Sequence, residues 1–365
     1  MAAISVIMPC YNQGYQLKRI LKAYDCQTTT EGFELIAVDD ASPDETFQVL
    51  NSYHPVNYQL KIFRQDKNRG PAAARNLAIL EAKSPLVVFV GDDIMPGKNF
   101  IQDHLDAHRK HSEPETAILG RVTWPDDMPV NTLMRHIDGV GAEQFSYYYL
   151  KDGEFYDFRH FYTANISAKR ELLSQVSYWF DTDFPFAAFE DAEFSFRLSQ
   201  KGMKILYRDA AIGSHYHYHN IWTFSERQYR AGLMAVLLTR KHPAVGQLIL
   251  GKNWPARLWM YALIGLTQNN ASEKISAYEE TLLHLLSKYE WSESPLLDGL
   301  YIRTLNYFFQ KGVVAKHFEK SVFHRSALNY YTKHALTSII YWYANECRKT
   351  GLPFPEASTF SHKLI

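Results

Sequence analysis

Leu86-Val87-Val88-Phe89-Val90-Gly91-Asp92-Asp93-Ile94-Met95-Pro96 is the stretch of sequence that decides the fold. The five apolar residues at its start predict a strand that is buried on both faces. Two adjacent carboxylates end the strand, and in open α/β sheets that edge is where ligands bind. Because two neighbouring acids repel each other, a divalent cation such as Mg²⁺ or Mn²⁺, shared with phosphate oxygens, is expected beside them. Gly91-Asp92-Asp93 before a proline is also ordinary turn chemistry, so the neighbouring segments must decide.

The composition limits the classes of protein to which this 365-residue chain can belong. Hydrophobic residues make up 46% and charged residues 21%, which predicts a packed core. Lys+Arg and Asp+Glu number 39 each, so the basic excess of a general nucleic-acid binder is absent. Three cysteines without metal-ligand spacing fit a reducing compartment. With no leader pattern after Met1 and no apolar run of about 20 residues, we expect a cytoplasmic protein, at most peripheral at the inner face of the membrane.

Strands alternate with helices of about ten residues through the first third of the chain. Strands are predicted over residues 4–8, 34–38, 60–63, 86–90 and 116–122, and helices over 15–26, 43–53, 72–82 and 99–111. Ser42 and Pro43 are expected to begin the second of these helices. The repeat is typical of βαβ units in a mostly parallel sheet flanked by helices. The strand ends should therefore bring Tyr11, Asp39, Asp40 and the Asp92–Asp93 pair to one edge.

Four segments in this order resemble the family 2 glycosyltransferases, which have the GT-A fold. The segments are residues 6–12, 38–44, 68–76 and 89–93. Each is short, but their order and spacing together are specific. The resemblance extends over about residues 4–220, and it implies a catalytic domain that binds a nucleotide sugar over residues 1–222.

The first strand ends would, by this resemblance, hold the nucleoside of a UDP-sugar. Pro9 and Tyr11 are implied to line a uracil pocket, and Asp40, with Asp39, to hydrogen-bond the base or the ribose. An aromatic ring covers a flat base, and a carboxylate accepts from an imide N–H or a hydroxyl. Arg69 is implied to lie near the diphosphate. The alternatives are core packing for the tyrosine, helix-end charge stabilisation for the aspartates and an ion pair for the arginine.

The metal site implied by the resemblance centres on Asp93 as the direct ligand, with Asp92 nearer the ribose or behind the ligand. Many family members carry an acid at the position of Gly91, so the motif departs from the commonest form. His215, His217 and His219 alternate, and on a strand alternate residues share one face. His215 is the first choice to complete the metal site and His217 the second, with a purely structural role as the alternative.

Two further segments complete the resemblance. Residues 161–170 resemble the segment that lines the donor sugar, with Asn165 at its centre. Glu190 and Asp191 precede a helix, and the resemblance implies that Asp191 is the general base that accepts the proton of the acceptor hydroxyl. Glu190 would contact the acceptor or orient the loop, and one base opposite the leaving group gives inversion. The alternative is that both acids stabilise a helix N-terminus. Residues 124–159 are predicted to be irregular, either facing the acceptor or packing.

The remainder, residues 223–365, is predicted to be a helical C-terminal domain. Apolar spacing near 3.6 residues predicts helices over 224–239, 255–266, 277–288, 295–311 and 331–348. Aromatic and basic residues mix over 254–261, a pattern seen in membrane-surface helices and, more often, in helix packing or a homo-oligomer interface. Acceptor, oligomer and membrane-surface contacts therefore all stay open for this domain.

The sequence as a whole predicts a metal-dependent, inverting glycosyltransferase. It would move a sugar from a UDP-sugar to a saccharide or glycolipid acceptor in polysaccharide or glycolipid synthesis, with Mn²⁺ or Mg²⁺ bound. Two alternatives stay open. A nucleotidyltransferase on a similar α/β fold would release pyrophosphate, and a non-catalytic nucleotide-sugar-binding protein is compatible with the departure at Gly91.

Overall fold

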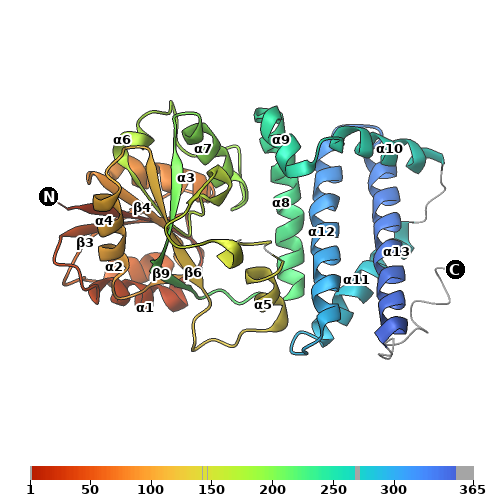
Figure 1. Ribbon diagram of the computed structural model, residues 1–365, viewed down its shortest axis with the longest axis horizontal. Coiled ribbons are helices and arrows are strands. Elements are labelled where there is room, and N and C mark those ends of the chain that lie inside the picture. Colours follow the sequence, from red (N-terminus) through yellow and green to blue (C-terminus); the bar gives the residue numbers. More distant parts are fainter. Residues whose placement is uncertain (1, 142, 146, 268–271, 351–365) are drawn as a thin grey trace. The chain divides into compact units, whose positions relative to one another are not determined.

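The computed structural model describes residues 2–141, 143–145, 147–267 and 272–350 (Figure 1). The chain divides into two compact units. The first, here the sheet unit, comprises residues 1–129 and 145–217, and the second, here the helical unit, comprises residues 130–144 and 218–365. Residues 351–365, which the sequence assigned to the helical region, lie outside the described residues.

A nine-stranded sheet forms the centre of the sheet unit, in the order β3-β2-β1-β4-β8-β6-β9-β5, with β7 paired to β9. The first four strands along the chain are parallel, as the βαβ pattern predicted. The sheet as a whole is mixed, because β8 lies antiparallel between β4 and β6, and β5 and β7 pair with β9 in antiparallel fashion. The strands are β1 (Ile4–Cys10), β2 (Phe33–Asp39), β3 (Gln59–Arg64), β4 (Leu86–Val90), β5 (Ile94–Pro96), β6 (Thr116–Thr123), β7 (Phe155–Tyr156), β8 (Asn165–Lys169) and β9 (Lys204–His215).

Helices cover both faces of this sheet (Figure 1). Along β4, Val87 and Phe89 belong to the core on one face, and Val88 and Val90 to the core on the other. This alternation confirms the predicted strand that is buried on both sides. The helices of the unit are α1 (Gly14–Asp25), α2 (Thr46–Ser52), α3 (Pro71–Glu81), α4 (Phe100–Lys110), α6 (Arg170–Leu173) and α7 (Glu190–Ser199), with 3₁₀ turns η1 (Tyr147–Tyr149) and η2 (Phe158–His160).

The predicted start of the second helix at Ser42 and Pro43 is wrong. Helix α2 begins at Thr46, and Ser42 does not cap it. The Ser42 hydroxyl instead accepts a hydrogen bond from the backbone N–H of Asn12 at 3.0 Å, and the Asp44 carboxylate accepts one from Gly14 at 3.0 Å. The capping-type side chains of this segment therefore bind the loop that follows β1, and they tie two strand-end loops together.

Residues 124–159 are not irregular throughout, contrary to the prediction. Helix α5 (Thr132–Asp138) begins after Asn131, whose side chain accepts a hydrogen bond from the Met134 N–H. Leu133, Met134 and Ile137 are buried in the helical unit, where α5 contacts α12. The apolar spacing of so short a helix is easily overlooked, because prolines and polar residues flank it.

Among the described residues, six helices make up most of the helical unit (Figure 1): α8 (Ile221–Lys241), α9 (Pro243–Leu250), α10 (Trp254–Thr267), α11 (Ser272–Lys288), α12 (Pro295–His317) and α13 (His324–Thr350). Five of them confirm predicted helices, whereas α9 was not predicted. Helices α8 and α12 approach closely at Gly232 and Gly312, where an added Cβ would lie 1.9 Å from the Phe309 carbonyl oxygen and 2.0 Å from that of Tyr229. Only glycine permits this packing.

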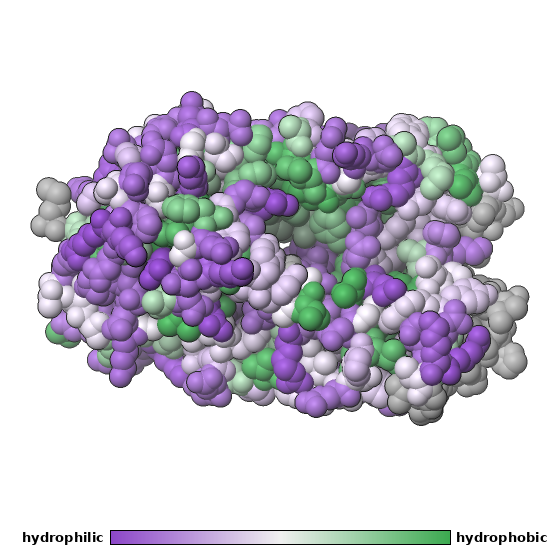
Figure 2. Space-filling model, in the orientation of Figure 1, coloured by the Kyte–Doolittle hydropathy of each residue, from purple (hydrophilic) through white to green (hydrophobic). Residues whose placement is uncertain are grey.

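Both polar and apolar side chains reach the surface of the molecule. Figure 2 shows that hydrophilic side chains cover much of the visible face of the sheet unit. On α10, Met260, Leu263 and Leu266 are exposed. Even so, among the described helices none is long and apolar enough to cross a membrane.

Candidate active site

The loops at the carboxyl ends of the parallel strands are tied to one another. The Asp92 carboxylate, just past β4, accepts a hydrogen bond from the backbone N–H of Tyr11, just past β1, at 2.8 Å. Among the described residues, three non-glycine residues have a positive φ: Asn12 at 59°, Ala41 at 57° and Phe189 at 66°. They follow β1, follow β2 and precede α7. Strained backbone of this kind is most common at functional sites, where the surrounding contacts hold a residue in an unfavourable conformation.

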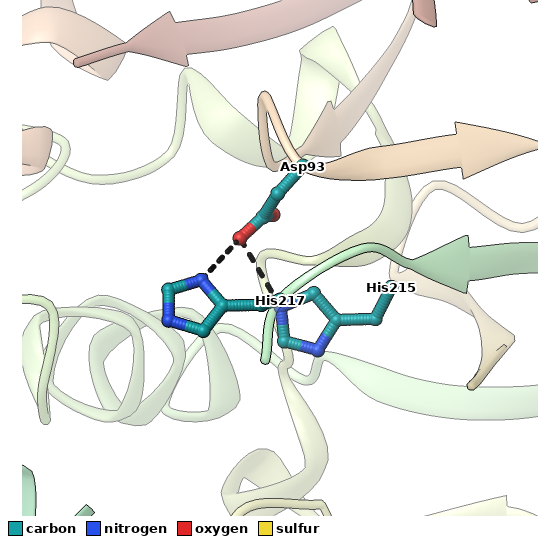
Figure 3. A group of neighbouring side chains, drawn as sticks. All are labelled: Asp93, His215 and His217. Carbon is teal, nitrogen blue, oxygen red and sulfur yellow. Dashed lines mark hydrogen bonds and ion pairs between the residues drawn. The ribbon is translucent and has the colours of Figure 1, made fainter. Parts of the chain in front are cut away.

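Asp93, His215 and His217 form one group at this edge (Figure 3). The Asp93 Oδ2 atom lies 3.2 Å from Nε2 of His215 and 3.1 Å from Nδ1 of His217. The register of the sheet creates the group, because β5 pairs with β9 so that Ile94 is opposite His215. The backbone N–H of Tyr216 then donates to the Asp93 carbonyl at 2.8 Å. A pairing of residues more than 120 positions apart thus converts two separate motifs into one site.

The two neighbouring carboxyls differ in their electrostatics. Burial raises the pKa of Asp92 well above its ordinary value, the negative charge of Asp93 raises it further, and the guanidinium of Arg75 opposes the rise. Burial acts on Asp93 in the same direction. There, however, His215 and His217 outweigh it and hold the pKa of the Asp93 carboxyl well below its ordinary value. Asp93 is therefore the ionised member of the pair, and the charged ligand a cation would need.

The donor set of this group fits a divalent transition metal. One carboxylate oxygen and two imidazole nitrogens all lie within 4.8 Å of one another. Imidazole suits first-row transition metals, and carboxylate suits Mg²⁺ and Mn²⁺, so Mn²⁺ satisfies both ligand types better than Mg²⁺ does. The sequence left a choice between His215 and His217, and the structure brings both to Asp93. His219 belongs to the helical unit, where its ring packs 5.1 Å from that of Phe224.

The start of α7 carries the two other acids of the predicted site. Glu190 is buried, and its carboxylate pairs with the Arg75 guanidinium of α3 at 2.8 Å. Asp191 is half-buried in the first turn of the helix, where its Oδ1 accepts from the Ala192 N–H at 2.8 Å. The ion pair anchors the first turn of α7, and Asp191 keeps part of its side chain at the surface. The pairing with Arg75 gives Glu190 a different environment from that of Asp191.

The residues expected around the nucleoside differ in what they offer a ligand. Tyr11 is 47% exposed and Pro9 is half-buried at the end of β1. Asp39 has no exposed surface, and it pairs with Arg64 at 3.1 Å. Asp40 is buried and accepts from the backbone N–H groups of Arg69 and Gly70, both at 2.8 Å, so it anchors the turn before α3. The Arg69 side chain is exposed.

Asn165 is not part of this group. It is fully buried, and its side-chain oxygen bonds to the His104 ring at 2.9 Å, while its amide donates to the carbonyls of Arg121 and Ala211 at 2.9 and 2.8 Å. Those carbonyls lie where β6 and β9 change register. An added Cβ on Gly120 would lie 2.3 Å from the Ala211 oxygen, so the backbones meet closely there. The structure thus gives Asn165 bonds that fasten three strands.

Two residues beside the group carry no sequence signal that we recognised. The Trp124 ring stacks on that of His215, with centroids 5.3 Å apart and an interplanar angle of 12°. Tyr216 lies between the two histidines in the chain, and its hydroxyl donates to Asp127 at 2.6 Å. An aromatic residue just after a strand has many uses, so only the three-dimensional arrangement identifies these two as neighbours of the site.

Comparison with known proteins identifies the class. Residues 5–176 match the family model for Glycosyl transferase family 2. Validoxylamine A glucosyltransferase of Streptomyces hygroscopicus subsp. jinggangensis (strain 5008) is 28% identical to this chain over 274 residues, covering 66% of this chain and 61% of that protein. "Uncharacterized glycosyltransferase YfnE" of Bacillus subtilis (strain 168) is 24% identical, covering 58% and 64%. The matches thus span somewhat less than two thirds of the length of these relatives.

Two solved structures share the fold. S. aureus TarS 1-349 in complex with UDP has a TM-score of 0.51 at 16% identity, covering 97% of this chain and 93% of that one. Mannosyltransferase PcManGT from Pyrobaculum calidifontis has a TM-score of 0.52 at 17% identity, covering 87% and 88%. The chain thus has the GT-A fold, with a helical C-terminal region. The family match is more specific: over residues 5–176 the chain matches glycosyl transferase family 2.

Proposed function

We propose that this glycosyltransferase is metal-dependent and transfers a sugar from a UDP-sugar to an acceptor hydroxyl with inversion. The observation that carries the proposal is the convergence of Asp93, His215 and His217 beside Asp92 at the ligand-binding edge of the sheet. Two proteins of the same fold support the donor class. TarS was crystallised with UDP, and PcManGT with GDP-Man and Mn²⁺. The choice of UDP over GDP rests on the resemblance of the first strand ends, and the assay below tests it.

A divalent ion held by this group would stabilise the negative charge that develops on the departing nucleoside diphosphate. Asp93 would supply a carboxylate oxygen to this ion, and the two histidines would supply imidazole nitrogens. Of Mn²⁺ and Mg²⁺, we propose Mn²⁺ because of the imidazoles. Asp92, whose carboxyl is bonded to the Tyr11 N–H, keeps the β1 and β4 loops together where the nucleotide would lie.

We assign the role of general base to Asp191. As the acceptor oxygen forms its bond to the anomeric carbon, the proton of that hydroxyl passes to the Asp191 carboxylate, and the bond from the anomeric carbon to the diphosphate oxygen breaks. A single displacement of this kind inverts the anomeric centre. Glu190 contributes indirectly, because its ion pair with Arg75 anchors the turn that presents Asp191. Tyr11, which is exposed, and Pro9, which is half-buried at the end of β1, would contact the uracil ring of the donor.

For the acceptor we propose a saccharide or glycolipid, in polysaccharide or glycolipid synthesis. The helical unit and the segment after β6 are the parts of the chain that remain for this contact, since the strand-end loops take up the donor. This assignment rests on the family resemblance and on the parts of the chain that are not assigned to donor binding. A screen of saccharide acceptors with the preferred donor tests it.

The test is a panel of UDP- and GDP-sugars with Mn²⁺, Mg²⁺, Co²⁺ and Fe²⁺, measuring nucleotide binding, donor hydrolysis and transfer. Asp93→Ala should abolish metal-dependent nucleotide binding. Asp191→Asn should bind donor as the native chain does but lower kcat by about 10²- to 10⁴-fold. Asp106→Asn, an exposed carboxylate on α4, serves as the control. If the native chain binds none of these nucleotides with any of the metals, the proposal is refuted. A product that retains the anomeric configuration would refute inversion alone.

A further inference from the structure

Tyr216 stands between the two histidines of the metal group, and its side chain is held from two other parts of the sheet unit. His215 and His217 both reach Asp93, one on either side of Tyr216 in the chain (Figure 3). Contacts that hold Tyr216 in place therefore also limit the directions in which these two side chains leave the backbone. This matters most for His217, which lies beyond the end of β9 and has 45% of its side chain exposed.

Helix α1 makes one half of this attachment. The side-chain amide of Gln16 donates to the Tyr216 carbonyl oxygen at 2.8 Å. Arg19 donates to the Tyr216 hydroxyl at 3.0 Å, and its guanidinium carbon lies 4.6 Å from the centre of the ring. Backbone, ring and hydroxyl of one residue are thus contacted by two side chains that are nearly one helical turn apart.

The segment after β6 makes the other half. The Tyr216 hydroxyl donates to Asp127 Oδ1 at 2.6 Å, and the other carboxylate oxygen pairs with Arg19. Three residues earlier, Trp124 stacks on the His215 ring. One short stretch of chain therefore contacts both a proposed metal ligand and the residue between the two histidines. We call Gln16, Arg19, Trp124 and Asp127 the bracket.

We infer that the bracket pre-organises the metal site, and that Asp127, acting through Tyr216, is a positioning residue for His215 and His217. The inference rests on the proposed function, because it assumes that the group binds a metal. Residues that contact the metal ligands, rather than the metal itself, orient the imidazole rings and are needed for full metal affinity. A lone exposed ion pair would add little to the stability of this arrangement. Here, however, the Asp127 carboxylate also accepts a hydrogen bond from the hydroxyl of Tyr216, which is adjacent in sequence to both histidines.

The chain contains a matched control on β9, the strand that leads to Tyr216. The Tyr207 hydroxyl donates to Asp209 Oδ1 at 2.7 Å, and Arg121 donates to that carboxylate at 3.2 Å. Asp209 and Asp127 have similarly exposed side chains, at 49% and 52%. Both trios combine a tyrosine hydroxyl, an arginine and an aspartate of similar exposure, although Tyr207 is buried and Tyr216 is half-buried. Only the Asp127 trio adjoins His215 and His217. A difference in Mn²⁺ affinity between Asp127→Ala and Asp209→Ala therefore reports the location of the trio beside the histidines, and not the general effect of losing such a trio.

The experiment is a titration of the full chain with Mn²⁺ alone, following free Mn²⁺ by electron paramagnetic resonance, with the thermal unfolding temperature recorded for every variant. Asp127→Ala and Tyr216→Phe should each weaken Mn²⁺ binding by about tenfold, the lower end of the range for residues behind a metal ligand. Asp209→Ala should bind as the native chain does. The double variant Asp127→Ala/Tyr216→Phe should bind about as weakly as either single variant, because the two residues act through one contact.

The outcomes separate this inference from the proposed function. If the native chain binds Mn²⁺, Asp93→Ala does not, and Asp127→Ala binds with native affinity, the bracket has no positioning role and the metal site stands. If Asp127→Ala and Asp209→Ala lose affinity equally, the effect is general and the inference is likewise overturned. If the native chain takes up no Mn²⁺, the metal site and the bracket's role fall together. Should Tyr216→Phe fold poorly, Asp127→Ala still decides, because about half of the Asp127 side chain is exposed to solvent.

Discussion

Replacing Arg75 by methionine tests the buried ion pair that anchors α7. The Arg75 and Glu190 side chains are 8% and 3% exposed, and they meet at 2.8 Å. Within the described residues, Arg75 Nε and Glu190 Oε2 have no hydrogen-bond partner, so the ion pair is the main hydrogen-bonded contact of both groups. Breaking such a pair from one side costs about 3–5 kcal/mol. Methionine retains apolar bulk beside Phe180, whose ring the guanidinium covers at 5.3 Å, so most of the loss should be electrostatic.

The assay is urea unfolding of the full chain. Hydrogen exchange of peptides that span β4 reports the unfolding of the sheet unit. With a slope of about 2 kcal/mol per molar urea, a loss of about 3–5 kcal/mol lowers the midpoint by about 1.5–2.5 M. Arg75→Met/Glu190→Leu should recover most of that loss, because no unpaired charge is left. The control is Arg109→Met, whose ion pairs lie in solvent and which should not move the midpoint. A shift below about 0.5 M for Arg75→Met, or a double variant less stable than the single one, would refute the reasoning.

Two more predictions concern other buried polar groups. Burial would raise the pKa of Glu34, but Lys61 and a neighbouring serine hydroxyl outweigh it and lower that pKa. The ionised form therefore stabilises the fold above the unfolded pKa of about 4.3, and this contribution is lost as pH falls through the folded pKa. Glu34→Gln should accordingly be less stable than native at pH 7, with the gap narrowing in acid, and equal losses at both pH values would contradict this. Asn165→Ala should lower the unfolding free energy by about 3 kcal/mol, since it strands the His104 ring and the Ala211 carbonyl, and should leave donor affinity unchanged in a nucleotide titration. Weaker donor binding at native stability would instead support the donor-sugar role that the resemblance implies.

Local patterns in the sequence predict most of the strands and helices of the fold. The strands that lead into the site were predicted because apolar runs such as residues 86–90 can only be buried on both faces of a sheet. The long amphipathic helices of the second half were predicted from their period. Prediction failed where a short signal had two uses. Ser42 and Pro43 look like a helix start, yet the Ser42 hydroxyl is engaged by the Asn12 N–H of another loop.

For the candidate site, the sequence determined which acids end the strands, because strand ends are local features and parallel strands share an edge. Only the tertiary structure decided that Asp93 has both His215 and His217 as neighbours, since that depends on the register of β5 against β9. It also decided that Asn165 is enclosed among three strands and donates to carbonyls of two of them. The physical reason is the same in each case. Side-chain chemistry and local period are written in short windows of sequence, whereas the contacts that select one use of a side chain join residues far apart in the chain.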